Sequence, residues 1–197
     1  MNTLETKRLL LCPWREEDAE TLYALASDPE VGPMCGWEPH ESVEESRRVI
    51  REVFCATETY AILSRESGAL LGSVGLQTPP EIFPELDATG QRELGYWLGR
   101  PYWGHGIMTE AAEALLHHGF ADMGLDAVWC SHYVWNGRSR RVIEKCGFRY
   151  QFTKDTVNLL GITNETLFYA LRSEQRSDGQ PHQQDIRAAL RRCKERE

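Results

Sequence analysis

The sequence predicts a single α+β domain. The length and the composition indicate one globular domain, and the pattern of elements indicates a mixture of strands and helices. The chain has 197 residues, which fits one domain better than two. A body of this size buries about 70% of the surface of its extended chain, so its core needs no disulfide or metal. Segments with the apolar period of strands are interspersed with segments that have the period of helices.

The composition is that of an ordinary globular protein, with 41% hydrophobic and 26% charged residues. This excludes collagen-like, wholly disordered and disulfide-scaffold chains. No apolar run approaches the roughly 18 residues that span a bilayer. The N-terminal stretch has acidic Glu5 before any apolar run and lacks the small-residue cleavage site of a signal peptide. We therefore expect a cytoplasmic protein.

The net charge of −8 makes the chain a poor candidate for binding nucleic acid or an anionic membrane. Any anionic ligand must then be held by local geometry. The six cysteines form no CxxC pair and lie within apolar patterns, so we expect reduced thiols that pack in the core.

The N-terminal half is predicted to hold three strands and two helices. In chain order we expect a strand at 7–13, a helix at 18–28, a helix from Ser42, and a hairpin of strands at 60–65 and 69–76. Ser42 and Glu45 have the spacing of a capping box, and the helix after them carries the apolar stripe Val49, Ile50, Val53 and Phe54. Residues 78–91 are rich in proline and acidic residues and predict an exposed loop.

The C-terminal half is predicted to hold four strands and two helices, followed by a polar segment. The strands are expected at 93–98, 127–134, 148–152 and 165–171, and the helices at 109–123 and 139–146, with Gly147 ending the second helix. Residues 173–181 are polar, and beyond them Ile186, Ala189, Leu190 and Cys193 predict a helix at 184–196. We therefore expect a domain at 1–172 and a linker with a short helix at 173–197.

A glycine-rich turn, Gly104-His105-Gly106-Ile107-Met108, connects a predicted strand to a predicted helix. Such a turn lets backbone amides and a helix dipole hold an anion such as pyrophosphate. By itself the pattern fits an ordinary tight turn equally well. A P-loop is excluded because no lysine follows Gly106, and a dinucleotide fingerprint would need glycine where Thr109 stands.

Three segments together resemble the GNAT superfamily of N-acetyltransferases, in the branch of bacterial ribosomal-protein N-terminal acetyltransferases. They are TKRLLLCPWREEDAE, ELGYWLGRPYWGHGIMTEA and NGRSRRVIEKCGF, in the family's order within residues 4–172. The chain departs from the family pattern at Trp103, where glutamine or arginine is usual, and at Met108, where glycine or alanine is usual. Cys12 replaces an arginine that is frequent in this branch.

The resemblance implies the GNAT fold: one mixed, mostly antiparallel sheet with helices on both faces. The strands at 93–98 and 127–134 would splay apart at the centre of this sheet. The pantetheine arm of acetyl-CoA would lie in the gap between them.

The resemblance also implies which residues bind acetyl-CoA as a co-substrate. Pantetheine would bond to the backbone of Trp97 and Leu98, and Asn136 and Ser139 would face the pantetheine and the sulfur. The pyrophosphate would lie on the turn and first helical residues, namely Gly104, His105, Gly106, Ile107, Met108 and Thr109. No metal is implied, and the histidines lack the HExxH spacing of a zinc site.

Acyl transfer to an amine needs a group that accepts a proton and, for the leaving thiolate, a group that donates one. Glu93 occupies the place of a general base in several superfamily members, and the alternative is an exposed carboxylate at a strand end. Ser139 would donate to the thiolate, or would only cap a helix. His132 and Tyr133 are alternative acids, and a backbone N–H near Leu98 would stabilise the oxyanion.

We therefore expect an acetyl-CoA-dependent N-acetyltransferase that acetylates a primary amine by direct attack in a ternary complex. The alternatives are a non-catalytic acyl-CoA-binding module and a nucleotide-binding enzyme. The acceptor, a protein N-terminus or a small molecule, is left open; it would be bound by residues 28–42 and 78–91. We expect a monomer or homodimer that binds neither nucleic acid nor membrane.

Overall fold

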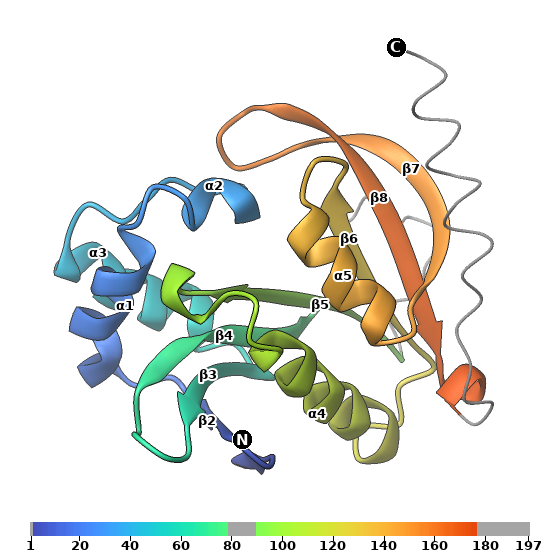
Figure 1. The fold of residues 1–197 in the computed structure, drawn as a ribbon, viewed down its shortest axis with the longest axis horizontal. Coiled ribbons are helices and arrows are strands. Elements are labelled where there is room, and N and C mark those ends of the chain that lie inside the picture. The colour runs from blue at the N-terminus through green and yellow to red at the C-terminus, as the bar shows by residue number, and fades with distance from the viewer. Residues whose placement is uncertain (1, 79–89, 177–197) are drawn as a thin grey trace.

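The computed structural model describes residues 2–78 and 90–176, and within these ranges eight strands pair in one sheet (Figure 1). The strand order is β1-β2-β3-β4-β5-β6-β8-β7. The strands are β1 (Leu4–Glu5), β2 (Leu9–Pro13), β3 (Thr59–Ser64), β4 (Leu70–Gln77), β5 (Gln91–Leu98), β6 (Ala127–Tyr133), β7 (Arg149–Val157) and β8 (Thr163–Arg172). The α-helices are α1 (Ala19–Ala26), α2 (Gly32–Cys35), α3 (Val43–Val49), α4 (Ile107–Ala121) and α5 (Gly137–Lys145).

The predicted splay at the centre of the sheet is confirmed. β5 and β6 form the parallel pair of the sheet, and their register covers Gln91 to Glu93 on β5 against Ala127 to Trp129 on β6. Beyond Glu93 the two strands have no paired residues, although β4 and β8 continue to pair with them on their outer sides. The sheet is therefore mixed, mostly antiparallel, and open between the C-terminal halves of β5 and β6.

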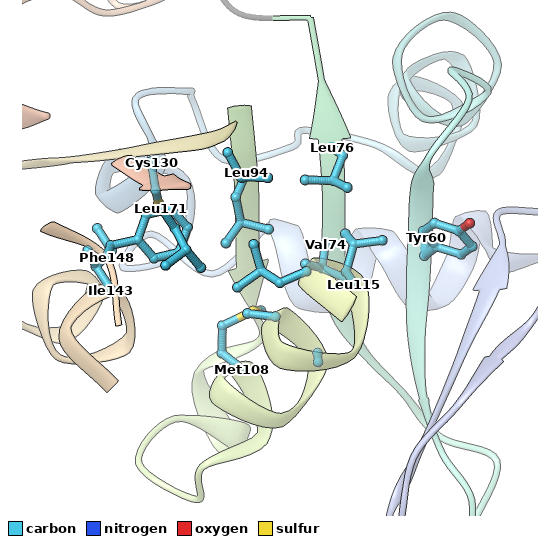
Figure 2. Close-up of a cluster of buried hydrophobic side chains, with 14 of the residues drawn as sticks. Tyr60, Val74, Leu76, Leu94, Met108, Leu115, Cys130, Ile143, Phe148 and Leu171 are labelled. Carbon is cyan, nitrogen blue, oxygen red and sulfur yellow. The ribbon is translucent and has the colours of Figure 1, made fainter. Parts of the chain in front are cut away.

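Helices cover both faces of the sheet, as expected. Strand alternation in β3 sends Tyr60 and Ile62 to one face and Ala61 to the other. The first face packs against α4 and α5 in the main core, part of which Figure 2 shows around Leu94, Met108 and Leu115. The second face packs against α1 and α3 in a smaller apolar cluster. The opening between β5 and β6 therefore has α4 and α5 on one face of the sheet and α1 and α3 on the other.

Two helices begin earlier than predicted. α4 begins at Ile107 rather than at Thr109, because the left-handed backbone of the turn ends at Gly106. α5 begins at Gly137 rather than at Ser139, because Asn136 is its N-cap and accepts a hydrogen bond from the Ser139 amide. The earlier start adds the amides of Ile107 and Met108 to the uncapped first turn of α4, whereas the start of α5 is capped by Asn136.

The second predicted helix has Ser42 as its N-cap, but only half of the expected capping box forms, and its predicted apolar stripe is partly wrong. The Ser42 hydroxyl accepts from the Glu45 amide, and the Glu45 carboxylate accepts from the Glu41 amide. After α3 the chain continues as a π-helix at Ile50–Phe54. The wider π-turn rotates the following side chains, so Ile50 is buried while Val53 is 49% exposed.

The sequence analysis missed α2, which lies between the helices predicted at 18–28 and from Ser42. Pro33 lies in the first turn of this short helix, where proline is tolerated. Gly36 ends the helix with a φ of +85°, and a Cβ there would lie 2.4 Å from the Tyr133 hydroxyl. A glycine is therefore needed where α2 approaches β6.

Several expectations concern segments at the edge of the described residues. A short 3₁₀ turn at Ser173–Arg176 follows β8. The helix predicted at 184–196 and most of the loop predicted at 78–91 lie outside the described residues, so these and the division at residue 172 stay predictions. Among the helices of the described residues, none is long and apolar enough to cross a membrane.

Candidate active site

A pocket of about 920 Å³ lies where β5 and β6 separate. Its wall includes residues from both strands, from the start of α4, from α5 and from the α2 segment. All of the predicted site residues except His105 line it, namely Glu93, Trp97, Leu98, Gly104, Gly106, Ile107, Met108, Thr109, Asn136 and Ser139. The fold thus brings together residues from three separate parts of the sequence.

The start of α4 has the geometry of an anion site. Gly104 and Gly106 have φ angles of +83° and +73°, which favour glycine. Gly106 is the N-cap and supplies no side-chain hydrogen bond, so no capping side chain occupies the first amides of this 15-residue helix. At α5, by contrast, the Asn136 side chain caps the Ser139 amide at 3.1 Å. The α4 amides and the helix dipole therefore remain available to a phosphate group.

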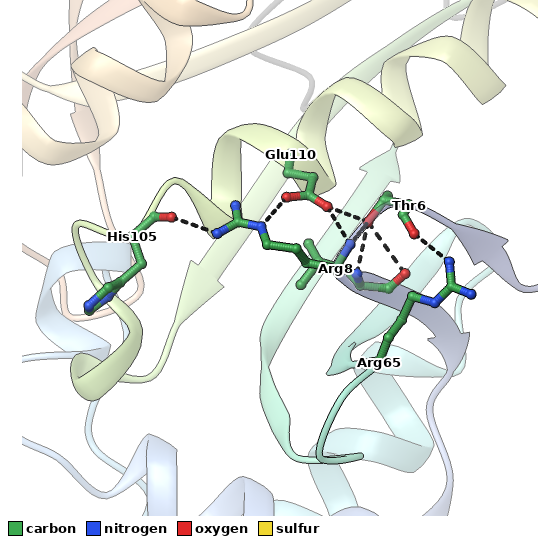
Figure 3. A network of polar contacts seen from close by, with 6 residues as sticks. Thr6, Arg8, Arg65, His105 and Glu110 are labelled. Carbon is green, nitrogen blue, oxygen red and sulfur yellow. Dashed lines mark hydrogen bonds and ion pairs between the residues drawn. The ribbon is translucent and has the colours of Figure 1, made fainter.

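Arg8 fixes the turn that precedes α4 (Figure 3). Its Nη1 donates to the His105 carbonyl at 3.1 Å, and its Nε donates to Glu110 at 2.6 Å. Glu110 also accepts from the Thr6 hydroxyl and the Arg8 amide; burial opposes its ionisation, but these hydrogen bonds prevail and lower its pKa. The His105 carbonyl is thereby held by Arg8, and His105 is the predicted residue that does not line the pocket.

Positive charge on α5 compensates locally for the acidic chain. Arg138, Arg141 and Lys145 line the pocket. The Arg138 guanidinium lies 4.6 Å from the ring centroid of Trp103, whose indole N–H donates to the Leu98 carbonyl at 2.8 Å. Trp103, which departs from the family pattern, therefore provides a fixed surface on which Arg138 stacks.

Glu93 lies in the pocket wall, at the last position where β5 pairs with β6. Its carboxylate accepts a hydrogen bond from the Ser131 hydroxyl at 3.2 Å. Burial raises the pKa of Glu93, and the Ser131 hydrogen bond partly offsets this rise. A partly buried carboxylate with a raised pKa is a stronger base than an exposed one.

Tyr96 is a candidate that the sequence analysis missed. Its hydroxyl lies 2.8 Å from the Ser139 hydroxyl, so β5 and α5 bring two proton-bearing groups into contact within the pocket. Burial raises the Tyr96 pKa well above its ordinary value, which keeps the phenol protonated. Strand alternation was the available signal, since it places Tyr96 on the same face as Leu94 and Leu98.

His132 and Tyr133 differ as candidate acids. His132 is buried; its Nδ1 donates to the Tyr133 carbonyl at 2.7 Å, so its Nε2 accepts from the Tyr169 hydroxyl. Burial lowers its pKa, so the ring is neutral and has no free proton to give. Tyr133 lines the pocket, and burial raises its pKa.

Over residues 2–78 and 90–176 no group of three or more His, Cys, Asp or Glu side chains could hold a metal ion.

The other side of the pocket is apolar and faces α1 and α3. Its wall comes from the α2 segment and from the π-helix, through Val31, Met34, Trp37, Val53 and Phe54. The α2 segment is held in place because its Met34 carbonyl accepts from Asn136 and its Gly36 carbonyl accepts from the Leu159 amide. Figure 1 shows the β7–β8 loop reaching toward α2 across the top of the molecule. Part of the predicted acceptor segment at 28–42 therefore does line the pocket.

Sequence comparisons identify proteins that are similar to this chain. The family model described as "Acetyltransferase (GNAT) domain" matches residues 8–149. An uncharacterized N-acetyltransferase, p20 of Bacillus licheniformis, is 29% identical over 155 residues, covering 76% of this chain and 83% of that protein. The putative ribosomal N-acetyltransferase YdaF of Bacillus subtilis (strain 168) is 29% identical over 106 residues, or 53% of this chain and 54% of that protein.

Solved structures share the fold at lower sequence identity. A GNAT-family acetyltransferase from Bacillus anthracis superposes with a TM-score of 0.78 at 22% identity, covering 88% of this chain and 99% of that one. RimL, described as a ribosomal L7/L12 alpha-N-protein acetyltransferase in complex with coenzyme A, has a TM-score of 0.70 at 17% identity, covering 87% of this chain and 98% of that one.

Proposed function

This chain belongs to the GNAT acetyltransferase family, and we propose that it transfers the acetyl group of acetyl-CoA to a primary amine by direct attack within a ternary complex. The amine is either a polypeptide N-terminus or a small molecule. The observation that carries the proposal is one pocket that joins the uncapped start of α4, the separated β5 and β6, and the partly buried Glu93.

The cofactor side of the pocket fits the parts of acetyl-CoA. The pyrophosphate would lie on the amides of 104–109, while Arg138, Arg141 and Lys145 supply nearby positive charge. The pantetheine would follow the backbone of Trp97 and Leu98 on the side that faces β6, where these residues have no strand partner, next to Asn136. This arrangement directs the thioester toward the opening between β5 and β6, where Glu93 and Ser139 both line the pocket.

In the proposed reaction the amine nitrogen attacks the thioester carbonyl carbon. The C–N bond forms, the C–S bond breaks, and the products are an amide and the thiol of CoA. The incoming ammonium must lose two protons in total: Glu93 accepts one, directly or through water, and the departing sulfur takes up the equivalent of the other. The raised pKa of Glu93 supports its role as the base.

Proton delivery to the departing sulfur is proposed for the Ser139 hydroxyl. The Tyr96 hydroxyl contacts Ser139 at 2.8 Å and can return a proton to it, so that the two groups act as a pair. A backbone N–H near Leu98 would stabilise the oxyanion of the tetrahedral intermediate. This set of roles uses residues from β5 and α5, the elements that flank the opening.

An acceptor screen with free-thiol detection tests the proposal. We expect CoA release that depends on a primary amine and that is lost when the same amine carries two N-methyl groups. Initial rates at varied concentrations of both substrates should give intersecting lines, since parallel lines would indicate a covalent acyl-enzyme. Tight CoA binding without thiol release for any amine would contradict the proposal and support an acyl-CoA-binding module instead.

A further inference from the structure

Two glycines leave a bare patch of sheet on the acceptor side of the pocket. Gly75 on β4 and Gly95 on β5 are direct cross-strand partners, and both line the pocket. Gly95 lies between Glu93 and Trp97 on the same face of its strand, because side chains alternate along a strand. The Gly75–Gly95 patch therefore lies beside the proposed base and beside an aromatic ring.

The fold does not need a glycine at position 95. Its φ lies outside the left-handed region, and a Cβ there would meet nothing nearer than the Gln77 side chain at 3.9 Å. Gly75 is more constrained, since a Cβ there would lie 3.1 Å from the Glu58 carbonyl and the Thr59 hydroxyl. A methyl group at position 95 would thus fit the fold and occupy space in the pocket.

Apolar side chains form part of the wall around this patch, beside the polar side chains of Thr59, Ser73 and Gln77. Trp37 and Trp97 meet edge to face with their ring centroids 6.1 Å apart. The π-helix turns Val53 out of the core, and Val53 and Phe54 line the pocket. Apolar walls over a bare floor stabilise a compact apolar group by removing it from water.

The charges of the lining disfavour an acceptor with several positive charges. Among the described lining residues, the carboxylates are those of Glu93 and Asp155, against the cations Arg138, Arg141 and Lys145. A polyamine would need further carboxylates for its additional ammonium groups. A monoamine needs only Glu93.

Building on the proposed function, we infer that the acceptor is a primary amine with a compact aromatic or branched aliphatic group close to its nitrogen. That group lies on the Gly75–Gly95 patch between Trp97 and Glu93, and the nitrogen reaches the Glu93 carboxylate. The same chemistry occurs in a small amine and in a polypeptide N-terminus whose first side chain is apolar.

The first experiment compares acceptors on the wild-type protein. Phenylethylamine and isoamylamine represent small apolar amines, and tripeptides that begin with Phe or Leu represent polypeptides. Ethylamine, spermidine and tripeptides that begin with Ser or Asp are the comparison set. We expect kcat/KM to favour the apolar members by roughly tenfold or more within each series. Equal use of all amines, or preference for spermidine, would overturn the inference and leave the transferase proposal intact.

The second experiment uses Gly95→Ala. We expect the ratio of kcat/KM for the apolar amines to kcat/KM for ethylamine to fall roughly tenfold or more, with the KM for acetyl-CoA unchanged. Gly137→Ala is the matched control, because a Cβ there meets nothing within 4 Å and Gly137 does not line the pocket. An equal loss for apolar and small amines in Gly95→Ala would contradict the inference.

A binding measurement separates the inference from the proposed function. Titration of the CoA-bound protein with the non-reactive N,N-dimethyl form of phenylethylamine, followed by tryptophan fluorescence or calorimetry, reports pocket occupancy without turnover. Binding that Gly95→Ala weakens supports the inference even if no amine is acetylated. Absence of binding in the wild type, together with no preference among acceptors, overturns it.

Discussion

Glu93 and Ser131 form a hydrogen bond where β5 and β6 stop pairing. This bond and the burial of Glu93 together determine the proton affinity of the proposed base. Burial favours the neutral carboxyl group, while the Ser131 hydroxyl stabilises the carboxylate. The two effects oppose each other, and burial is the larger. This balance suits a group that must accept a proton from the amine and release it before the next turnover.

Replacing Glu93 with glutamine keeps the shape of the side chain and removes the proton acceptor. General-base help is typically worth about 10²–10⁴-fold, so we expect kcat to fall by roughly 10²-fold with acetyl-CoA affinity nearly unchanged. Raising the pH should partly restore the rate, because alkali deprotonates the amine without the enzyme. A pH–rate profile of Glu93→Gln measures this, and a wild-type rate at pH 7 would remove Glu93 from the mechanism.

Ser131→Ala should shift the pH dependence in a defined direction. Loss of the hydroxyl removes the hydrogen bond that lowers the Glu93 pKa, so that pKa rises further. Because Glu93 must be ionised to act as a base, the acidic limb of kcat/KM should move to higher pH, with the plateau rate retained. A shift to lower pH, or none, would show that Ser131 does not tune this carboxylate.

At the scale of elements, the turn before α4 leaves the start of the helix uncapped, while Arg8 binds the His105 carbonyl in the same turn. Arg8, between β1 and β2, and Glu110 on α4 lie 102 positions apart in the sequence, and their side chains meet at 2.6 Å. Their contact joins the N-terminal edge of the sheet to the helix that would bind pyrophosphate. The turn is therefore fixed from outside the pocket, which leaves its inner side to the ligand.

Gly106→Val tests the turn. At a φ of +73° a β-branched residue adds about 1–3 kcal/mol of strain and blocks backbone approach, so we expect CoA affinity to fall by roughly tenfold or more. Gly106→Asn tolerates the left-handed conformation and isolates the effect of the added side chain. Calorimetric titration with CoA measures the affinity, and circular dichroism checks the fold.

Gly124→Val is the matched control for that strain. Gly124 has a φ of +67°, a Cβ there meets nothing within 4 Å, and it does not line the pocket. This variant should lose stability and keep its CoA affinity. Unchanged affinity in a folded Gly106→Val protein would contradict the placement of the pyrophosphate on this turn.

At the scale of the whole molecule, a net charge of −8 opposes the approach of an anionic cofactor. The start of α4 and the three cations on α5 reverse this field locally. Because these features lie at one end of the opening and the apolar walls lie on the other face of the sheet, the pocket would separate the proposed anionic cofactor from the proposed apolar acceptor. The division of the core into two faces produces this polarity.

The raised pKa of Glu93 also has a consequence for folding stability. Below the ordinary carboxyl pKa of about 4.3 the group is neutral in both states and has no effect. As pH rises through that value toward the folded pKa, the unfolded chain ionises first and stability is lost. We therefore expect Glu93→Gln to have a higher melting temperature than wild type at pH 7–8 and the same value near pH 4. A lower melting temperature at pH 7–8 would contradict this account.

The sequence alone determined the fold class, most of the strands and the glycine-rich turn before α4. These depend on local patterns: apolar alternation, the positions of Gly104 and Gly106, and motif order. Helix starts were wrong by two residues at α4 and α5, because a helix begins where its cap lies, and the caps are Gly106 and Asn136. The π-turn after α3 left no sequence signal at all.

Tertiary structure alone decided the contacts between distant residues. The Tyr96–Ser139 pair, the Glu93–Ser131 hydrogen bond and the Arg8–His105 contact join residues between 38 and 97 positions apart. The apolar side of the pocket likewise depends on the α2 segment and the π-helix lining the same pocket as Gly75 and Gly95. A sequence pattern reports which face of an element is apolar, but only packing brings two such faces together, and the chemistry of this pocket depends on that packing.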